Sequence, residues 1–368
     1  MRAKTKITGV LYSILMLAVL YVLITNYQLC RDSVGEALLI CRNLIIPSLF
    51  PYMIFSRYLM ASPLSSVFHL MFGKLSRKLL NLPGECISVF LLGSICGFPI
   101  TAKCASQMYR DGVCSKNQAE RLLCLANNAG CAFTVSIAGG LVLGSMRSGV
   151  ALYVIQLVSA IIAHQIILFL HKDGFVHESV TVKAKIEVRT PELPVIISES
   201  VVNVFSVCGT IVFFTITMNF VREYLGEHEL LCLITNGVLE LSTAVGMLAD
   251  LLPSGGFAMA SAFICWAGLS VHTQTAVILK DSGISLKLYL FSKATQSGIG
   301  ALMAWIYTRL FASSITCISF VSPSEIVMQS KLRPYFYIYI ISFIFIIAIV
   351  FMANFIYNIV DSKIRKFI

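Results

Sequence analysis

Charged residues are scarce in this sequence: Asp, Glu, Lys and Arg together make up only 12% of its 368 residues. About a quarter of a soluble domain is charged, so this scarcity excludes an ordinary soluble protein. Hydrophobic residues reach 57%, and the mean hydropathy is +0.84. At about 20 apolar residues per span, the length corresponds to roughly eight membrane crossings. The composition therefore predicts an integral membrane protein.

The motifs of several enzyme classes are also missing. The sequence has no phosphate-binding loop, no nucleophile elbow, no H-E-x-x-H pair and no paired carboxylates at hydrolase spacing. Its 12 cysteines form no C-x-x-C pair, and no nearby His completes a metal-binding pattern. We therefore expect no catalytic residues and no enzyme activity. We also expect no metal or other cofactor, and reduced cysteines that pack in the interior.

Basic residues exceed acidic ones, and the net charge is +10. They do not cluster with aromatic residues on a soluble module, so nucleic acid is not an expected partner. Their excess is typical of loops that face the cytoplasm and anionic membrane lipid. The apolar runs and one long polar stretch divide the chain into four parts. These are an N-terminal transmembrane helix (1–33), a first half (34–171), a polar cytoplasmic linker (172–194) and a second half (195–368).

Two other segments are ambiguous. Residues 66–81 place Lys and Arg among leucines, which favours an amphipathic helix at the membrane interface. Whether 66–81 and 230–252 span the membrane or lie at its surface stays open, and so does the side of the C-terminus.

Glycine and proline interrupt an apolar segment of the first half at Gly93–Lys103. In hydrocarbon, broken backbone is tolerated only where it is buried in protein or lines a wet cavity. A second interruption follows at Ala267–Gln274, and an ungapped alignment of the two halves places Gly97 over Gly268. Paired interrupted segments point to the binding site of a transporter. We predict an all-α polytopic membrane protein with an inverted repeat and two re-entrant helical hairpins, at 85–112 and 254–283.

The polar residues near both breaks are candidates for a binding site. Lys103 adds a positive charge close to the N-terminus of the half-helix that starts near Thr101, which suits a small anionic ligand. A kinked helix with Lys103 reaching the interface is the alternative. The second break offers Ser270, His272 and Gln274. His272 is a candidate for proton coupling, although a lone histidine is more often structural.

Further polar residues lie within apolar segments. Asn127 and Asn128 are costly there unless partnered, so we expect them to bond the broken backbone or the ligand. Glu240 is a candidate for ion coupling, with an interfacial carboxylate as the alternative, and Lys293 and Gln296 are weaker candidates of the same kind.

Several motifs resemble one family. They are G-F-P-I-T-A-K, Y-R-D-G-V-C-S-K-N-Q-A-E-R-L-L-C-L-A-N-N-A-G, I-T-N-G-V-L-E-L and G-L-S-V-H-T-Q. Together they resemble the sporulation integral membrane proteins of the YlbJ (SpoVV) family, which carry nucleoside recognition (Gate) domains. This family is distantly similar to concentrative nucleoside transporters, whose substrate lies between two re-entrant hairpins. The resemblance implies a substrate site made of Gly97, Phe98, Pro99, Thr101, Lys103, Asn127, Asn128, Ser270, His272 and Gln274.

The resemblance also implies a function. It is that of a secondary transporter or facilitated carrier that moves dipicolinic acid across the outer forespore membrane of an endospore-forming bacterium. A nucleoside carrier and a non-transporting membrane subunit of a sporulation complex are the alternatives. Membrane lipid is an expected partner. A coupling ion, Na⁺ or H⁺, and assembly into a homo-oligomer stay open.

Overall fold

The computed structural model describes residues 2–61, 64–98, 100–170, 192–225, 228–251 and 256–311, and these residues are almost entirely helical. Pro99, most of the 172–194 linker and the last apolar run lie outside this part of the chain. Three helical segments are long and apolar enough to cross a membrane: Met146–Leu170, Leu193–Glu223 and Gly256–Leu279. The prediction of an all-helical protein with the character of a membrane protein is therefore confirmed.

The elements follow one another with short connections, and the η segments are π-helical. In chain order they are α1 (Arg2–Thr25), α2 (Tyr27–Ile40), η1 (Cys41–Ile45), α3 (Ile46–Ala61), α4 (Leu64–Leu75), η2 (Ser76–Leu80), α5 (Cys86–Cys96), α6 (Ile100–Arg110), α7 (Lys116–Ala126), η3 (Ala132–Val142), α8 (Met146–Leu170), α9 (Leu193–Leu225), α10 (Glu229–Leu239), α11 (Leu241–Leu251), α12 (Gly256–Trp266), α13 (Gly268–Leu279) and α14 (Lys287–Leu310).

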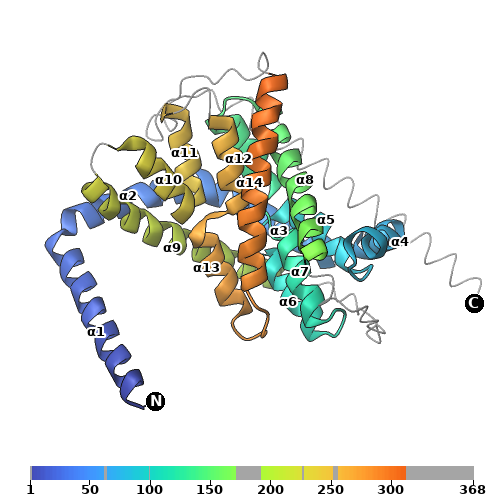
Figure 1. Ribbon diagram of the computed structural model, residues 1–368, viewed down its shortest axis with the longest axis horizontal. Helices are drawn as coiled ribbons and strands as arrows, with labels where there is room; N and C mark the ends of the chain where they lie inside the picture. The colour runs from blue at the N-terminus through green and yellow to red at the C-terminus, as the bar shows by residue number, and fades with distance from the viewer. Residues whose placement is uncertain are drawn as a thin grey trace, which may run out of the picture.

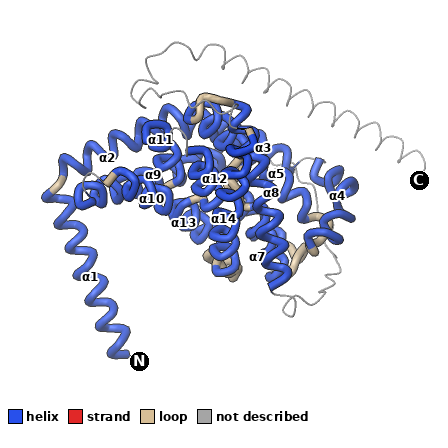
Figure 2. The backbone as a smooth tube through the Cα atoms, turned by 45° about the horizontal axis from the view of Figure 1, so that its top comes forward, coloured by secondary structure: helices blue, strands red, loops and turns tan. Residues whose placement is uncertain are grey.

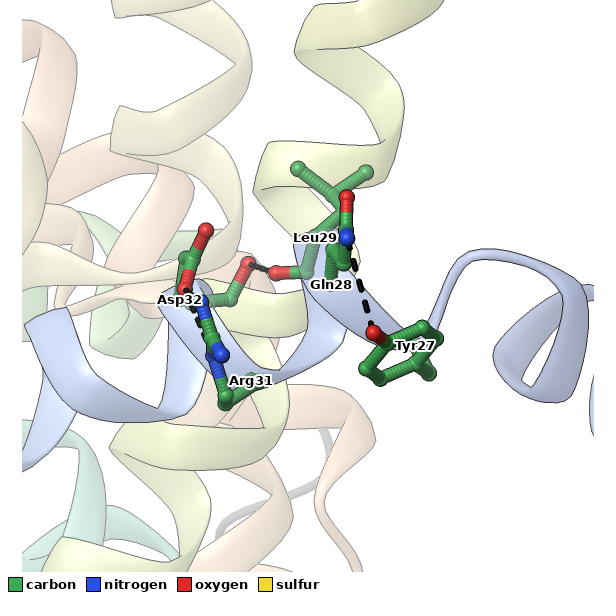
Figure 3. Close-up of polar contacts among 6 residues, drawn as sticks. Tyr27, Gln28, Leu29, Arg31 and Asp32 are labelled. Atoms are coloured by element: carbon green, nitrogen blue, oxygen red, sulfur yellow. Dashed lines mark hydrogen bonds and ion pairs between the residues drawn. The ribbon is translucent and has the colours of Figure 1, made fainter.

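Helix α1 projects away from the other helices, and α2 begins at an elbow beside Asn26 (Figure 1). The start of α2 is polar: the amide of Gln28 reaches the hydroxyl of Tyr27, and Arg31 forms an ion pair with Asp32 at 3.0 Å (Figure 3). Both members of this ion pair are largely exposed. The polar residues after the first apolar run therefore form a surface of α2 and take no part in the core.

Helix α4 and η2 form an amphipathic unit at the edge of the bundle (Figure 1). Lys74, Arg77 and Lys78 are exposed, whereas Leu80 is buried. The exposed basic residues expected within 66–81 are therefore present, although Leu70 and Met71 are exposed as well. The apolar side of η2 packs beside the start of α5.

Helices α5 and α6 form a hairpin at the first predicted break. Helix α5 ends at Cys96, Gly97 adopts a φ of +75°, and α6 starts at Ile100. At the other end, the thiol of Cys86 shares a hydrogen bond with that of Cys114, which lies in the turn after α6. The start of α5 and the end of α6 therefore lie together, so both arms open toward the same end of the bundle.

The second predicted break separates α12 from α13, but these helices do not fold back on each other. Ala267 adopts a φ of +75° between them. The hydroxyl of Ser261 in α12 donates to the carbonyl of Gly300, and the ring of His272 in α13 contacts that of Tyr289. As the residue number increases from Ser261 to His272, the number of the contacted residue in α14 decreases from Gly300 to Tyr289. Helices α12 and α13 therefore run in one direction, antiparallel to α14. The hairpin expected over 254–283 is therefore wrong, because Ala267 bends a single segment without reversing it.

A second hairpin is formed instead by α10 and α11, which are joined by Glu240 in extended backbone. Its open end lies near the start of α12, where Leu248 contacts Gly256. The first hairpin opens toward the opposite end, which also holds the α13–α14 turn. There, the backbone N–H of Ser285 donates to the carboxylate of Glu120 in α7. The two hairpins thus enter the bundle from opposite ends, α10–α11 toward the top and α6 toward the bottom of Figure 1.

The helix lengths repeat in the same order. Helices α5, α6 and α7 have 11 residues each, and so do α10, α11 and α12. In the first series, a chain break, the short segment η3 and the long helix α8 follow. In the second series, a chain break, the short helix α13 and the long helix α14 follow. The ungapped alignment that placed Gly97 over Gly268 therefore pairs a hairpin tip with a break in a continuous segment. By element order and length, α5–α6 corresponds to α10–α11.

Helix α14 packs against α12, α8 and α7, and it lies beside α12 and α8 in Figure 2. A small residue allows its closest contact: a Cβ on Gly300 would lie 2.6 Å from the Sγ of Cys265 in α12. Small residues at such positions let membrane helices approach closely. The glycine therefore fixes α12 against α14 and, through it, the position of the second break.

Candidate functional site

A pocket lies where the two hairpin tips meet the two chain breaks. The tips contribute Cys96, Phe98, Glu240, Leu241 and Ser242, and the breaks contribute Ala129, Gly130, Phe133, Ser270, Val271 and Gln274. The wall is completed by Ile45 and Leu49 from η1 and α3 and by Val207 and Ile211 from α9. Both hairpin tips and both chain breaks therefore line one pocket.

The first tip contacts the break after α7 through backbone atoms. The N–H of Phe98 donates to the carbonyl of Asn128 at 3.0 Å. A Cβ on Gly97 would lie 2.9 Å from the Cα of Gly130, so only glycine fits there. Two glycines therefore allow the backbone of the tip to touch the backbone of the break beside the pocket.

The second tip contacts the other break in a similar way. A Cβ on Gly268 would lie 3.2 Å from the backbone of Leu239 and Leu241. The carboxylate of Glu240 accepts hydrogen bonds from the backbone N–H groups of Ser242 at 3.0 Å and Thr243 at 2.7 Å. Glu240 therefore caps the N-terminus of α11, where a negative charge is favourable. It lines the pocket at the same time.

Asn127 and Asn128 have their partners within the protein. The amide of Asn127 donates to the hydroxyls of Tyr289 at 3.0 Å and Thr275 at 3.2 Å. The Oδ1 of Asn128 accepts from the Nζ of Lys293 and from the Nε2 of Gln296. The amides thus join the α7 break to α13 and α14, and both lie behind the pocket and outside its lining.

Lys103 does not lie in the pocket. Its Nζ is 3.1 Å from a carboxylate oxygen of Glu199 in α9, and both side chains are nearly half exposed. Lys103 is therefore not part of this pocket, and its expected role at a substrate site stays a prediction. Lys103 lies near the N-terminus of α6, as expected, but on the face that packs against α9.

The residues of the second break divide between two environments. Ser270 and Gln274 line the pocket, and the Nε2 of Gln274 donates to the hydroxyl of Thr210 at 2.6 Å while its Oε1 has no partner. His272 lies outside the lining, with its ring edge-on to Trp266 and Tyr289. We therefore regard Ser270 and Gln274 as site residues and His272 as a packing residue.

Thr101 supports the first tip from behind. Its hydroxyl donates to the carbonyl of Gly97 at 3.3 Å, and the side chain is fully buried. Of the other predicted residues, Phe98 lines the pocket directly and Pro99 lies outside the described residues. The apolar wall from η1, α3 and α9 was not predicted, because it has no polar or glycine signal in the sequence.

In the described part of the chain, no group of three or more His, Cys, Asp or Glu side chains is arranged to hold a metal ion. The fold and the site define a helical membrane protein whose pocket is built from two hairpin tips and two interrupted helices. Comparisons with protein-family models, curated proteins and solved structures gave no match to this chain. Its function is therefore argued from the geometry of the site.

Proposed function

We propose that this protein is a secondary carrier for a small solute and that the two hairpins are re-entrant parts of an inverted repeat. The observation that carries the proposal is the pocket shared by both tips and both breaks. In a membrane, interrupted backbone is tolerated where it is buried or lines a cavity, and carriers use such segments to bind their substrates. Entry of the hairpins from opposite ends supports an inverted arrangement.

The lining of the pocket offers the groups that a flat, partly aromatic solute needs, and the cavity, of about 40 Å³ in this conformation, has to widen to admit one. Phe98, Phe133 and Val271 provide apolar surface, while Ser270 and Gln274 provide hydrogen-bonding groups. Helix α13 starts at the pocket without a side-chain cap on its first turn. Free N–H groups at such a helix start favour a carboxylate. These features support dipicolinate, the substrate that the family resemblance implies, and with it a role in the outer forespore membrane.

A neutral nucleoside is the second candidate, and Glu240 favours it. This carboxylate is the single charged group in the described pocket lining, and 3% of its residue surface is exposed. A buried negative charge repels a dianion but accepts hydrogen bonds from hydroxyl groups. A comparison of dipicolinate with uridine therefore distinguishes a carrier of a dianion from a carrier of a neutral nucleoside.

The test is transport of each solute into proteoliposomes that contain the purified protein. We expect uptake of one of them above empty vesicles, and we expect Gln274→Ala to reduce it. The matched control is Gln107→Ala. Gln107 is exposed in α6, and its side-chain amide donates to the carboxylate of Asp111. Absence of uptake with correctly folded protein would refute a carrier and favour a non-transporting subunit.

A further inference from the structure

Lys293 is a buried cation in the first third of α14. Only 1% of its surface is exposed, and its Nζ donates to Asn128 Oδ1 and Gln296 Oε1, both at 2.8 Å. Within the described residues, no Asp or Glu forms an ion pair with it. A buried charge without a counterion is costly, so the surrounding structure must compensate it by other means.

The compensation comes from the end of a helix. Helix α7 ends at Ala126, and the Nδ2 of Asn128 donates to the carbonyl of Leu125 at 2.8 Å. The opposite atom of the same amide, Oδ1, accepts from Lys293. The amide therefore links the ammonium group to the C-terminus of α7, which carries the negative end of the helix dipole.

The carbonyl groups of the break are already bonded to protein donors. That of Asn128 accepts from the N–H of Phe98, and that of Ala129 accepts from the Nε2 of Gln156 at 2.8 Å. Gly130 accepts from the N–H of Thr134. In carriers with broken helices, such carbonyls and half-helix C-terminal ends are the groups that coordinate an inorganic cation. Here three protein donors occupy the carbonyls, and the lysine reaches the end of α7 through the side chain of Asn128.

We propose that the ammonium group of Lys293 is a resident cation, which replaces a bound inorganic cation beside the α7 break. It positions the break, and through Asn128 it holds the contact with the first hairpin tip. The inference deepens the proposed function and rests on it in one respect: the pocket of the carrier would form and bind its solute without Na⁺.

The experiment compares thermal unfolding of the purified full-length protein in NaCl and in N-methylglucamine chloride at equal ionic strength. We expect equal unfolding temperatures for the wild type, because the cation position is filled. Lys293→Ala should unfold at a lower temperature in N-methylglucamine. Propylammonium should restore part of the loss, whereas 1-propanol, which has a similar size but no charge, should not. The control is Lys287→Ala on the exposed start of α14, which should neither lose stability nor respond.

Two results would overturn the inference. One is a specific stabilisation of the wild type by Na⁺, and the other is equal rescue of Lys293→Ala by propylammonium and 1-propanol. If Lys293→Ala does not fold, Lys293→Gln replaces it, and the comparison of salts on the wild type remains decisive. Failure of the proposed function would look different: neither solute would bind or be transported in any salt, while the unfolding temperatures followed the pattern above.

Discussion

The substitution Gly97→Ala tests the contact between the first hairpin tip and the α7 break. Gly97 has φ +75° and ψ −172°, a conformation that is essentially confined to glycine. Forcing alanine into it costs about 1–3 kcal/mol. The new Cβ would also lie 2.9 Å from the Cα of Gly130 and 3.3 Å from the carbonyl carbon of Ala129. Backbone atoms cannot rotate away, and overpacking of this kind adds about 1–3 kcal/mol.

The matched control is Gly112→Ala in the turn between α6 and α7. Gly112 has a similar φ of +70°, but nothing lies within 4 Å of a Cβ added there. This substitution carries only the conformational cost of a positive φ, about 1–2 kcal/mol. Gly97→Ala should therefore be more destabilising than Gly112→Ala by about 2 kcal/mol.

A thiol-reactive fluorescent dye provides the assay, because Cys86, Cys124 and Cys265 are buried free thiols that become reactive on unfolding. Denaturant titrations of the two variants, followed with this dye, give the difference in unfolding free energy. Equal destabilisation of the two variants would refute the backbone contact between the tip and the break. It would also remove the reason for placing the tip against the break beside the pocket.

Three further substitutions address the buried charges and the surface ion pair. Glu240→Gln removes the charge that caps α11 and should cost about 1 kcal/mol in denaturant unfolding; an unchanged midpoint would contradict the cap. Asn128→Ala removes one of the two acceptors of Lys293 and should cost about 2 kcal/mol, measured in the same way. Lys103→Ala breaks an exposed ion pair with Glu199 and should cost less than about 1 kcal/mol, with no change in the Kd of the pocket ligand. A selective loss of dipicolinate affinity in this variant, with uridine unaffected, would return Lys103 to the site.

Local signals in the sequence predicted the local structure in part. The predicted break at Gly93–Lys103 spans the end of α5 and the start of α6, whereas at Ala267–Gln274 only Ala267 separates α12 from α13 and the remaining residues belong to α13. Adjacent amides in an apolar helix were expected to bond the broken backbone or a ligand, and instead Asn127 and Asn128 bond mainly side chains of α13 and α14. The breaks depend on residues near each other in the chain, where backbone preferences act directly, whereas the partners of the amides are distant in the sequence.

Long-range features were not predictable in this way. The tip at Glu240 has no Gly or Pro, because the side chain caps α11 and satisfies the turn by itself. The apolar run around it therefore reads as one continuous segment. Lys103 pairs with Glu199, 96 residues away, which no local pattern indicates. The importance of Lys293 likewise depends on Asn128, 165 residues earlier in the chain.

Glu240 and Lys293 place opposite charges on the two hairpin systems, and each charge compensates the end of a half-helix. Glu240 caps the N-terminus of α11, and Lys293 compensates the C-terminus of α7 through Asn128. Neither charge is therefore available to neutralise a charged solute, so the proposed carrier would recognise one through neutral groups of the lining such as Gln274. If a carrier cycle separates the first tip from its break, it breaks the hydrogen bond from the N–H of Phe98 to the carbonyl of Asn128. A solute that bridges the tip and the break would offset that cost, which would couple binding to the conformational change.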